Sequence, residues 1–310
     1  MKEKIRGWIE SRPESLGFES FELKSIVAGE SNYNCFLETP GGKKVLRISR
    51  DVSRKNRLSN EYHTLKFLER ENVDSVPQAL KFSENTDFGD VLLETMVGTN
   101  DIGKEGFKPE ILEALAREMA EIYSIPVERY RRFRDESYDK KRSLQEEYQE
   151  DFREFSRQPF QEYMEEVDEP DERITRFFRK QKDLVESIPD IMFERSLVHG
   201  DLGFNIRAAG DDVFIVDWEY SKLGCAESEI IYFFEHERLS DEQRKIFLQE
   251  FRKHYELDNV FELTREQFPK FIAFNDAIWA ANRVEKEGKD EHQELLEDRL
   301  DYLEKLYDED

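Results

Sequence analysis

The stretch that decides the fold reads LVHGDLGFNI over residues 197–206 and continues as VFIVDWE over residues 213–219. It places a histidine, two aspartates and an asparagine close together in the chain, between two short apolar runs. The runs have the composition of β-strands, and the AGDD sequence at residues 209–212 is typical of a turn. We therefore expect the runs at 197–198 and 213–216 to form a hairpin.

Polar side chains at strand ends can leave the core and meet a ligand, so we expect Asp201, Asn205 and Asp217 to converge. Carboxylate and amide oxygens suit a hard divalent cation, and Mg²⁺ usually binds one or two carboxylates together with phosphate oxygens. This predicts phosphoryl transfer, in which one aspartate deprotonates a hydroxyl while the other aspartate and the asparagine hold metal against ATP. The alternative is a polar turn between two buried strands.

The order of HGD at residues 199–201, Asn205 and VDWE at residues 216–219 resembles the aminoglycoside phosphotransferase/choline kinase family. These are small-molecule kinases with a protein-kinase-like fold. The resemblance implies that Asp201 is the catalytic base and that Asn205 and Asp217 are metal ligands. In that family the asparagine usually stands five residues after the aspartate, whereas here it stands four residues after it.

Composition narrows the class of protein. The chain has 310 residues, 71 acidic against 47 basic residues and a formal net charge of −24. A nucleic-acid binder needs a basic face against phosphate, so this charge argues against that class. Such acidity causes self-repulsion that salt screens, and we expect a halophilic protein that is stabilised by molar salt.

Cysteine usage and hydropathy indicate the compartment. The two cysteines, Cys35 and Cys225, lie far apart and in no metal-binding spacing, which favours a reducing environment. The start of the sequence lacks the apolar segment of a signal peptide, and no run approaches the ~20 apolar residues of a membrane span. We expect a cytoplasmic protein with no membrane partner.

The first part of the chain is rich in strand signals. A short helix at 5–12 precedes three expected strands, which should form an antiparallel meander. The sequence predicts an α+β, protein-kinase-like two-lobed fold, with a β-rich nucleotide-binding lobe at 1–97 and a helical lobe at 98–310. The expected strands lie around residues 21–26, 33–37 and 45–48, with turns at 29–32 and 40–42.

Three residues in this part are expected to contact phosphate, and a fourth is expected to orient one of them. The turn at 29–32 should lie over the ATP phosphates, where Ser31 and Asn32 offer donors; an ordinary hairpin turn is equally consistent. Arg47 occupies the place of the lysine in the kinase V-A-I-K strand and should contact phosphate, the alternative being a surface arginine. Glu61, on an expected helix at 54–70, should pair with Arg47.

The segment after the strand at 91–93 reads as the hinge between the lobes. Adenine would bind backbone groups there, so Glu94 and Met96 are assigned to the nucleotide site. Met96 fits equally well as a core residue.

The remainder of the chain is expected to be helical. The charged stretch at 136–187 should form two or three helices broken near Pro159 and Pro170, which either shape the acceptor pocket or form a solvated hairpin. The other expected helices lie at about 109–123, 241–255, 264–284 and 290–308.

Taken together, the sequence predicts an ATP- and Mg²⁺-dependent kinase that phosphorylates a hydroxyl of a small molecule, such as an aminoglycoside, choline or sugar-like acceptor. The alternative is a catalytically weak nucleotide-binding regulator, a pseudokinase. A protein kinase is disfavoured because Asp217 is not followed by the glycine of D-F-G and no A-P-E follows.

Overall fold

A computed structural model describes the chain apart from residues 12–15, 18, 30, 51–56, 99, 103–105, 135–138 and 309–310. The chain divides into two compact units. Unit 1 comprises residues 1–136, 197–222 and 240–255, and unit 2 comprises residues 137–196, 223–239 and 256–310. The boundary between lobes that the sequence places at residue 97 stays a prediction.

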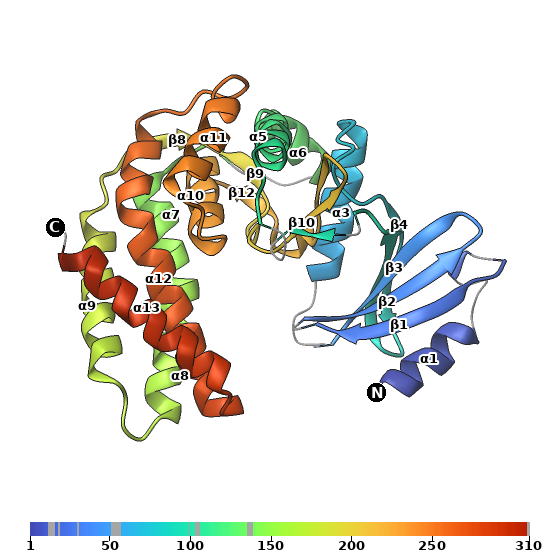
Figure 1. The fold of residues 1–310 in the computed structure, drawn as a ribbon, viewed down its shortest axis with the longest axis horizontal. Helices are drawn as coiled ribbons and strands as arrows, with labels where there is room; N and C mark the ends of the chain where they lie inside the picture. Colours follow the sequence, from blue (N-terminus) through green and yellow to red (C-terminus); the bar gives the residue numbers. More distant parts are fainter. Residues whose placement is uncertain are drawn as a thin grey trace. The chain divides into compact units, whose positions relative to one another are not determined.

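Unit 1 contains a five-stranded antiparallel sheet with the strand order β1-β2-β3-β5-β4 (Figure 1). The predicted meander is confirmed, because β1 pairs with β2 and β2 pairs with β3, both antiparallel. The strands are β1(Glu22–Ala28), β2(Asn32–Thr39), β3(Gly42–Ser49), β4(Ala79–Thr86) and β5(Gly89–Thr95).

The two faces of this sheet differ. One face packs with Ile5 and Ile9 of helix α1(Lys2–Glu10) in a core that includes Leu46 and Ile48 of β3. Because side chains alternate along a strand, the neighbouring positions point to the opposite face. The strand registers place three predicted site residues on that opposite face: Asn32, Arg47 and Glu94.

A second, three-stranded sheet in unit 1 carries the deciding stretch. Its order is β11-β10-β6, and it is built from β6(Asn100–Asp101), β10(Ile206–Ala209) and β11(Asp212–Ile215). The hairpin predicted from the sequence is therefore wrong for its first strand. The run at 197–198 belongs to β9(Ser196–Val198), whereas β11 pairs with β10. A tight turn joins β10 to β11, and the paired residues at its two ends are Ala209 and Asp212. Gly210 lies within this turn with φ +69°.

Helices complete unit 1. The helix predicted at 54–70 is observed as α3, and its buried residues include Glu61 together with Leu58, Leu65 and Leu68. The remaining elements of unit 1 are α3(Arg57–Arg70), α5(Pro109–Tyr123), α6(Val127–Arg134), the 3₁₀ turn η2(Trp218–Tyr220) and α11(Asp241–Phe251). Strand β12(Lys222–Gly224) follows η2.

Unit 2 is mainly helical, and α12 and α13 lie against each other (Figure 1). Near Pro159 the π-helical η1 ends and α8 begins, with Pro159 in the first turn of α8, where a missing N–H is tolerated. The break predicted near Pro170 is also observed, because α8 ends at Glu166 and α9 begins at Glu172. The elements are β7(Lys141–Ser143), α7(Leu144–Asp151), η1(Phe152–Arg157), α8(Gln158–Glu166), α9(Glu172–Ser187), β8(Met192–Glu194), α10(Ala226–His236), α12(Asn259–Glu287) and α13(Asp290–Asp308).

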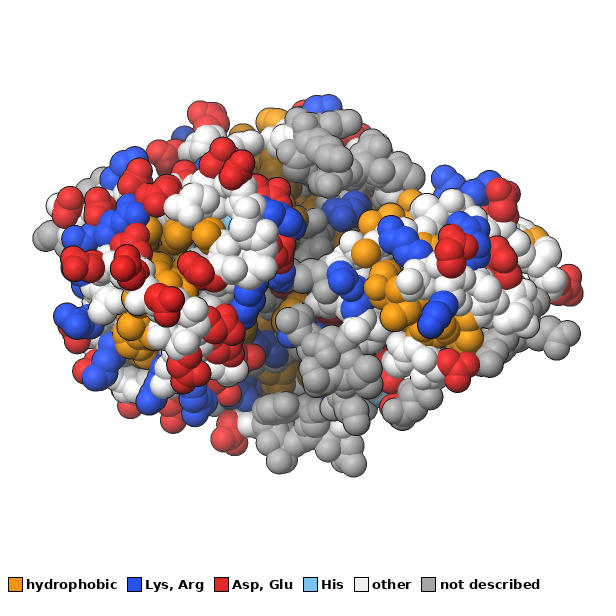
Figure 2. Space-filling model, turned by 90° about the horizontal axis from the view of Figure 1, so that it is seen from below, with side chains coloured by type: hydrophobic (Ala, Val, Ile, Leu, Met, Phe, Trp, Pro, Cys, Tyr) orange, Lys and Arg blue, Asp and Glu red, His pale blue; other side chains and the backbone are white. Residues whose placement is uncertain are grey.

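The surface carries both signs of charge. On the face shown in Figure 2, acidic and basic side chains alternate over short distances rather than forming one basic patch. Within the part of the chain that the structure describes, no helix combines the length and the apolar character needed to cross a bilayer.

Candidate active site

A buried ion-pair cluster in unit 1 is centred on Arg47. Its Nη1 donates to Glu61 Oε1 at 2.5 Å, and its Nη2 donates to Asp217 Oδ1 at 2.6 Å. A third carboxylate, that of Glu219, lies 3.6 Å from Nη2. The predicted pair of Arg47 and Glu61 is thus present in the structure, and the alternative of a solvated surface arginine is wrong.

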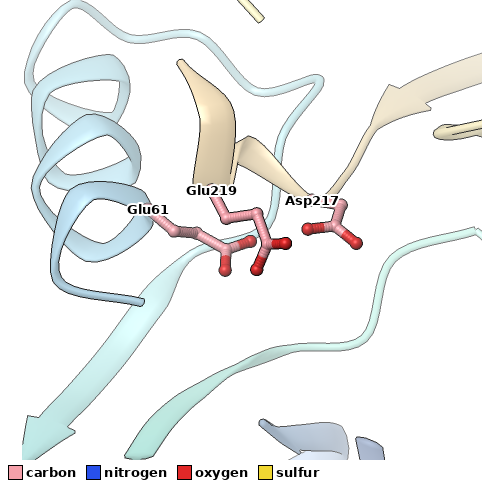
Figure 3. A group of neighbouring side chains, drawn as sticks. All are labelled: Glu61, Asp217 and Glu219. Atoms are coloured by element: carbon pink, nitrogen blue, oxygen red, sulfur yellow. The ribbon is translucent and has the colours of Figure 1, made fainter. Parts of the chain in front are cut away.

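The acidic partners of Arg47 come from two segments far apart in sequence. Glu61 lies on α3, whereas Asp217 and Glu219 follow β11 (Figure 3). One carboxylate oxygen from each of the three lies within 4.8 Å of the other two. The backbone N–H of Trp218 also donates to Glu61 Oε1, at 3.2 Å, and so ties the two segments together.

The electrostatics of the cluster reflect one guanidinium shared among several carboxylates. Burial disfavours the charge on Arg47, but Glu61, Asp217, Glu94 and Glu219 together raise its pKa above the ordinary value. Burial raises the pKa of Glu61, an effect that Arg47 offsets only in part. Burial likewise raises the pKa of Glu94 to about 7, with Arg47 opposing the change and Asp217 adding to it.

Some polar atoms of the cluster are left without partners. Among the described residues, Arg47 Nε, Glu61 Oε2 and Glu94 Oε2 are buried and accept or donate no hydrogen bond. Burying such atoms unpaired is costly. A cation bound at the cluster would supply a partner for the unpaired carboxylate oxygens.

Two members of the site were not assigned from sequence, Glu219 and Arg57. Glu219 Oε2 accepts a hydrogen bond from Asn32 Nδ2 at 2.7 Å, which links β2 to the segment after β11. Arg57 Nη1 donates to Ser31 Oγ at 3.3 Å and lies 3.8 Å from Glu219 Oε1. The only sequence signal for Glu219 was its place in the VDWE motif, two residues after Asp217.

Arg57 is held in place by aromatic contact. Its guanidinium lies 4.2 Å from the centroid of the Tyr220 ring and also donates to the Tyr220 hydroxyl.

The turn at 29–32 is closed by a hydrogen bond from the N–H of Gly29 to the carbonyl of Asn32, at 2.8 Å. Ser31 thus contacts the guanidinium of Arg57, and Asn32 is linked to the Arg47 cluster through Glu219. The binding of phosphate by this turn stays a prediction.

The loop at 199–205 is fixed by its histidine. The N–H of Asp201 donates to His199 Nδ1 at 3.2 Å, so Nδ1 is the acceptor and the proton resides on Nε2. That Nε2–H donates to the carbonyl of Val216 at 2.8 Å. His199 therefore has a neutral ring that connects the backbone of Val216, the residue before Asp217, to the loop that holds Asp201.

Close packing also constrains the loop. Gly200 has φ +82°, and a Cβ built there would lie 2.4 Å from the carbonyl oxygen of Tyr220. The carbonyl of Asn205 accepts from the N–H of Val216 at 2.9 Å, while Asn205 Nδ2 donates to the carbonyl of Asp201 at 2.6 Å. These bonds connect the backbones of Asp201, Asn205 and Val216, the residue before Asp217. The convergence of the Asp201, Asn205 and Asp217 side chains on one point stays a prediction.

The donor set fits a hard cation. The Asp217 side chain is 35% exposed and its backbone is left-handed at φ +70°, a conformation that costs energy for a non-glycine residue. Asn205 spends its amide N–H on Asp201, so the group it has to offer an ion is its carbonyl oxygen. Carboxylate and amide oxygens from Asp217, Asn205 and Glu219 are the ligands that Mg²⁺ prefers.

The two residues that the sequence analysis assigns to the hinge, Glu94 and Met96, differ in placement. Glu94 faces the cluster with its side chain, because its register partner on β3, Val45, lies on the same face as Arg47. The N–H of Met96 donates to the carbonyl of Lys43 at 3.2 Å, so this donor is occupied by the sheet. The described contacts do not bring Met96 to the cluster.

The sequence matches a known protein family and part of a curated relative. A model of the phosphotransferase enzyme family matches residues 22–267, a range that contains every residue of the site. A curated protein from Metamycoplasma hominis, named Protein LicA homolog, is 30% identical over 99 residues. That match covers 29% of this chain and 39% of the relative's length.

Solved structures share the fold at low identity. Choline kinase from Cryptosporidium parvum superposes with a TM-score of 0.66 at 14% identity, covering 100% of this chain and 96% of that one. The GDP and kanamycin complex of APH(2")-IIia gives a TM-score of 0.68 at 14% identity, covering 99% of each chain. The α+β, protein-kinase-like fold and the family resemblance predicted from sequence are confirmed.

Proposed function

Because the chain belongs to the phosphotransferase enzyme family, we propose that it transfers the terminal phosphoryl group of ATP, with Mg²⁺, to a hydroxyl of a small molecule. The observation that carries this proposal is the Arg47 cluster joined to the 199–205 loop through the Val216 backbone. It combines a phosphate-binding cation, an acidic oxygen set and a carboxylate base in one unit of the fold.

In this proposal Asp201 is the base. Its carboxylate accepts the proton of the acceptor hydroxyl while the hydroxyl oxygen forms a bond to the terminal phosphorus. The bond from that phosphorus to the bridging oxygen breaks, and its electron pair leaves with ADP. Kinase-type transfer depends chiefly on positioning and charge, so the fixed loop matters as much as the basicity of Asp201.

Arg47 and the turn at 29–32 bind the phosphates. Arg47 is oriented by Glu61, and a guanidinium offers two parallel donors to phosphate oxygens. Arg57 adds a second positive charge next to Ser31. The neutral His199 takes no part in proton transfer in this proposal, because both ring nitrogens are already engaged in holding the loop.

Asp217 and Asn205 would hold the magnesium ion, and Glu219 is a further carboxylate within 4.8 Å of Asp217. The bound ion would supply positive charge against the phosphate oxygens. Asp217 Oδ1 is bonded to Arg47, so nucleotide binding requires Arg47 Nη2 to exchange this carboxylate for phosphate. This exchange conserves the number of charged contacts that Arg47 makes.

The acceptor class is proposed from the comparisons. Proteins with a similar fold include a choline kinase, an ethanolamine kinase and APH(2")-IIia in complex with GDP and kanamycin. Choline, ethanolamine and kanamycin are all alcohols that carry amino or ammonium groups. A cationic alcohol of this kind also suits a chain with a net charge of −24, because the protein field attracts it.

The test compares Asp201→Asn with wild type, using ATP, Mg²⁺ and each of the three acceptors in molar salt. We expect product formation to fall by about 10³-fold or more, because the base is lost, while nucleotide binding stays within about twofold. Asp211→Asn, in the exposed turn between β10 and β11, is the matched control and should leave turnover unchanged. Undiminished phosphorylation by Asp201→Asn would rule out the assigned role.

One observation favours a second candidate, a nucleotide-binding regulator without strong catalysis. In this structure Arg47 and Asp217 bind each other rather than leaving their charges to a ligand. Comparing ATP consumption without acceptor and with each of the three acceptors separates the two candidates. Acceptor-dependent consumption supports the kinase, and tight nucleotide binding without any turnover supports the regulator.

A further inference from the structure

The backbone of Asp217 has a conformation that costs energy for residues other than glycine. Its φ of +70° and ψ of +55° lie in the left-handed region, and the 3₁₀ turn η2 begins directly after it. A strained residue of this kind persists where the surrounding structure enforces it. The contacts that hold η2 therefore decide where the Asp217 carboxylate points.

One face of α3 supplies contacts to η2 and to the residue after it. Asn60 and Glu61 precede Thr64 by four and three residues, so the three side chains emerge on the same side of the helix. Glu61 Oε1 accepts from the N–H of Trp218 at 3.2 Å, and Thr64 Oγ1 lies 2.8 Å from Ser221 Oγ. This face of α3 thus contacts both the beginning and the end of the segment that follows Asp217.

The Asn60 side chain bonds to the backbone of that segment. Its Nδ2 donates to the carbonyl of Glu219 at 3.2 Å, to the carbonyl of Ser221 at 2.9 Å and to the Ser221 hydroxyl oxygen at 3.1 Å. A carbonyl can only accept, so it is the nitrogen of the Asn60 amide that faces them. Because main-chain atoms are held, these bonds fix the course of the chain after Asp217 whatever ligand the nearby side chains bind.

We propose that Asn60 is a positioning residue of the metal site, which directs the Asp217 carboxylate through the backbone of η2. This inference rests on the proposed function, in which Asp217 holds Mg²⁺. Groups that orient metal ligands in this indirect way contribute about 10- to 100-fold to metal affinity. Asn60 also directly precedes Glu61, which orients Arg47. Consecutive residues of one helix thus position the metal ligand and the cation assigned to phosphate.

The experiment measures ATP binding to the full chain by calorimetry, once with Mg²⁺ and once with EDTA. The ratio of the two affinities, the magnesium gain, reports the metal site without any turnover. Asn60→Ala removes all three bonds, whereas Ser221→Ala removes the hydroxyl acceptor and leaves both carbonyls. Lys66→Ala is the control, because Lys66 also lies on α3 but pairs with Glu69 of the same helix. Hydrogen exchange of the segment 217–222 and the melting temperature are measured without ligand.

We expect Asn60→Ala to lower the magnesium gain by about tenfold or more, while ATP affinity in EDTA stays within about twofold. The segment 217–222 should exchange faster in the ligand-free variant, because its backbone loses bonds to α3. Ser221→Ala should lower the magnesium gain by under about threefold, since the two carbonyl acceptors remain. Lys66→Ala should change neither the magnesium gain nor the exchange of this segment.

Three results would overturn the inference. The first is a wild-type magnesium gain in Asn60→Ala, and the second is a loss of ATP affinity in that variant that is equal with Mg²⁺ and with EDTA, which would assign Asn60 to the packing of α3 alone. The third is an equal loss of magnesium gain in Lys66→Ala. A wild type that binds ATP no better with Mg²⁺ would instead contradict the proposed function at its metal step, before any variant is compared, and the inference would fail with it.

Discussion

Arg47 on β3 and Glu61 on α3 form an ion pair whose Nη1–Oε1 distance is 2.5 Å, with side chains that are 5% and 0% exposed. Burial removes the screening that makes surface ion pairs weak. The pair is unequal, however. Arg47 has further carboxylates nearby, in Asp217 and Glu219, whereas Arg47 is the one cation that pairs with Glu61 among the described ion pairs.

This asymmetry predicts unequal losses of stability. Arg47→Met leaves the buried carboxyl groups of Glu61 and Glu94 without their nearby cation and should lower the free energy of unfolding by about 3–5 kcal/mol. Glu61→Gln keeps Asp217 and Glu219 beside Arg47 and should cost about 1–2 kcal/mol. Urea denaturation measures both changes. Arg176→Met, which breaks an exposed pair with Glu304, is the control and should cost under about 1 kcal/mol. Equal losses at Arg47 and Glu61 would contradict the shared-cation description.

Glu94 predicts a pH dependence of stability. Its carboxyl is 6% exposed, and burial raises its pKa from the ordinary 4.5 to about 7. Between these values the folded state keeps a proton that the unfolded state releases, so rising pH favours unfolding. At about 1.4 kcal/mol per pH unit, the penalty amounts to about 3 kcal/mol once the pH exceeds 7.

Glu94→Gln should remove this penalty. The free energy of unfolding of the variant, minus that of wild type, should grow from pH 4.5 to pH 7 and then level off. Denaturant titrations at half-unit pH intervals give this difference directly. Glu113→Gln, an exposed position on α5, is the control and should show no such trend. A difference between Glu94→Gln and wild type that does not change with pH would mean that folding leaves the pKa of Glu94 unshifted.

Gly200 and Gly210 form a matched pair for testing the loop. Both have positive φ, at +82° and +69°, but an added Cβ meets the Tyr220 carbonyl oxygen at 2.4 Å at position 200 and no atom within 4 Å at position 210. Gly210→Ala should cost about 1–2 kcal/mol, the price of a left-handed alanine.

Gly200→Ala should cost more, by about 2 kcal/mol or more, because the backbone next to Asp201 must move. Its turnover should fall at least about tenfold, while Gly210→Ala keeps wild-type turnover. Thermal melting and steady-state kinetics measure both effects. Identical behaviour of the two variants would show that the close approach to Tyr220 does not govern the loop.

The net charge of −24 predicts stabilisation by salt. Repulsion among exposed carboxylates weakens as the Debye length falls from about 10 Å at 0.1 M to about 3 Å at 1 M. The melting temperature should therefore rise by several degrees between 0.05 M and 1 M NaCl and then level off. A melting temperature that is constant or falls over this range would refute the expected halophilic character.

The sequence specified some residues of the site and left others unassigned. Arg47 and Glu61 were predicted because a strand arginine that interrupts an apolar run, followed by a helix with a glutamate, has a definite meaning in this fold. Glu219 was not assigned, because an acid two residues after Asp217 has no distinguishing pattern. Arg57 was not assigned either, because its partners Ser31 and Tyr220 lie at distant positions in the chain.

By itself the sequence determined the elements and the chemistry. Alternating apolar residues specified the meander, helical periodicity specified α3 and the C-terminal helices, and HGD with DWE specified the class of reaction. These signals are local, because strand and helix periods and turn residues act over a few neighbours. The tertiary structure alone decided that β11 pairs with β10, that Glu61, Asp217 and Glu219 share Arg47, and that Asn32 bonds to Glu219. These features depend on which distant segments meet in the fold, and no short-range pattern in the chain encodes that.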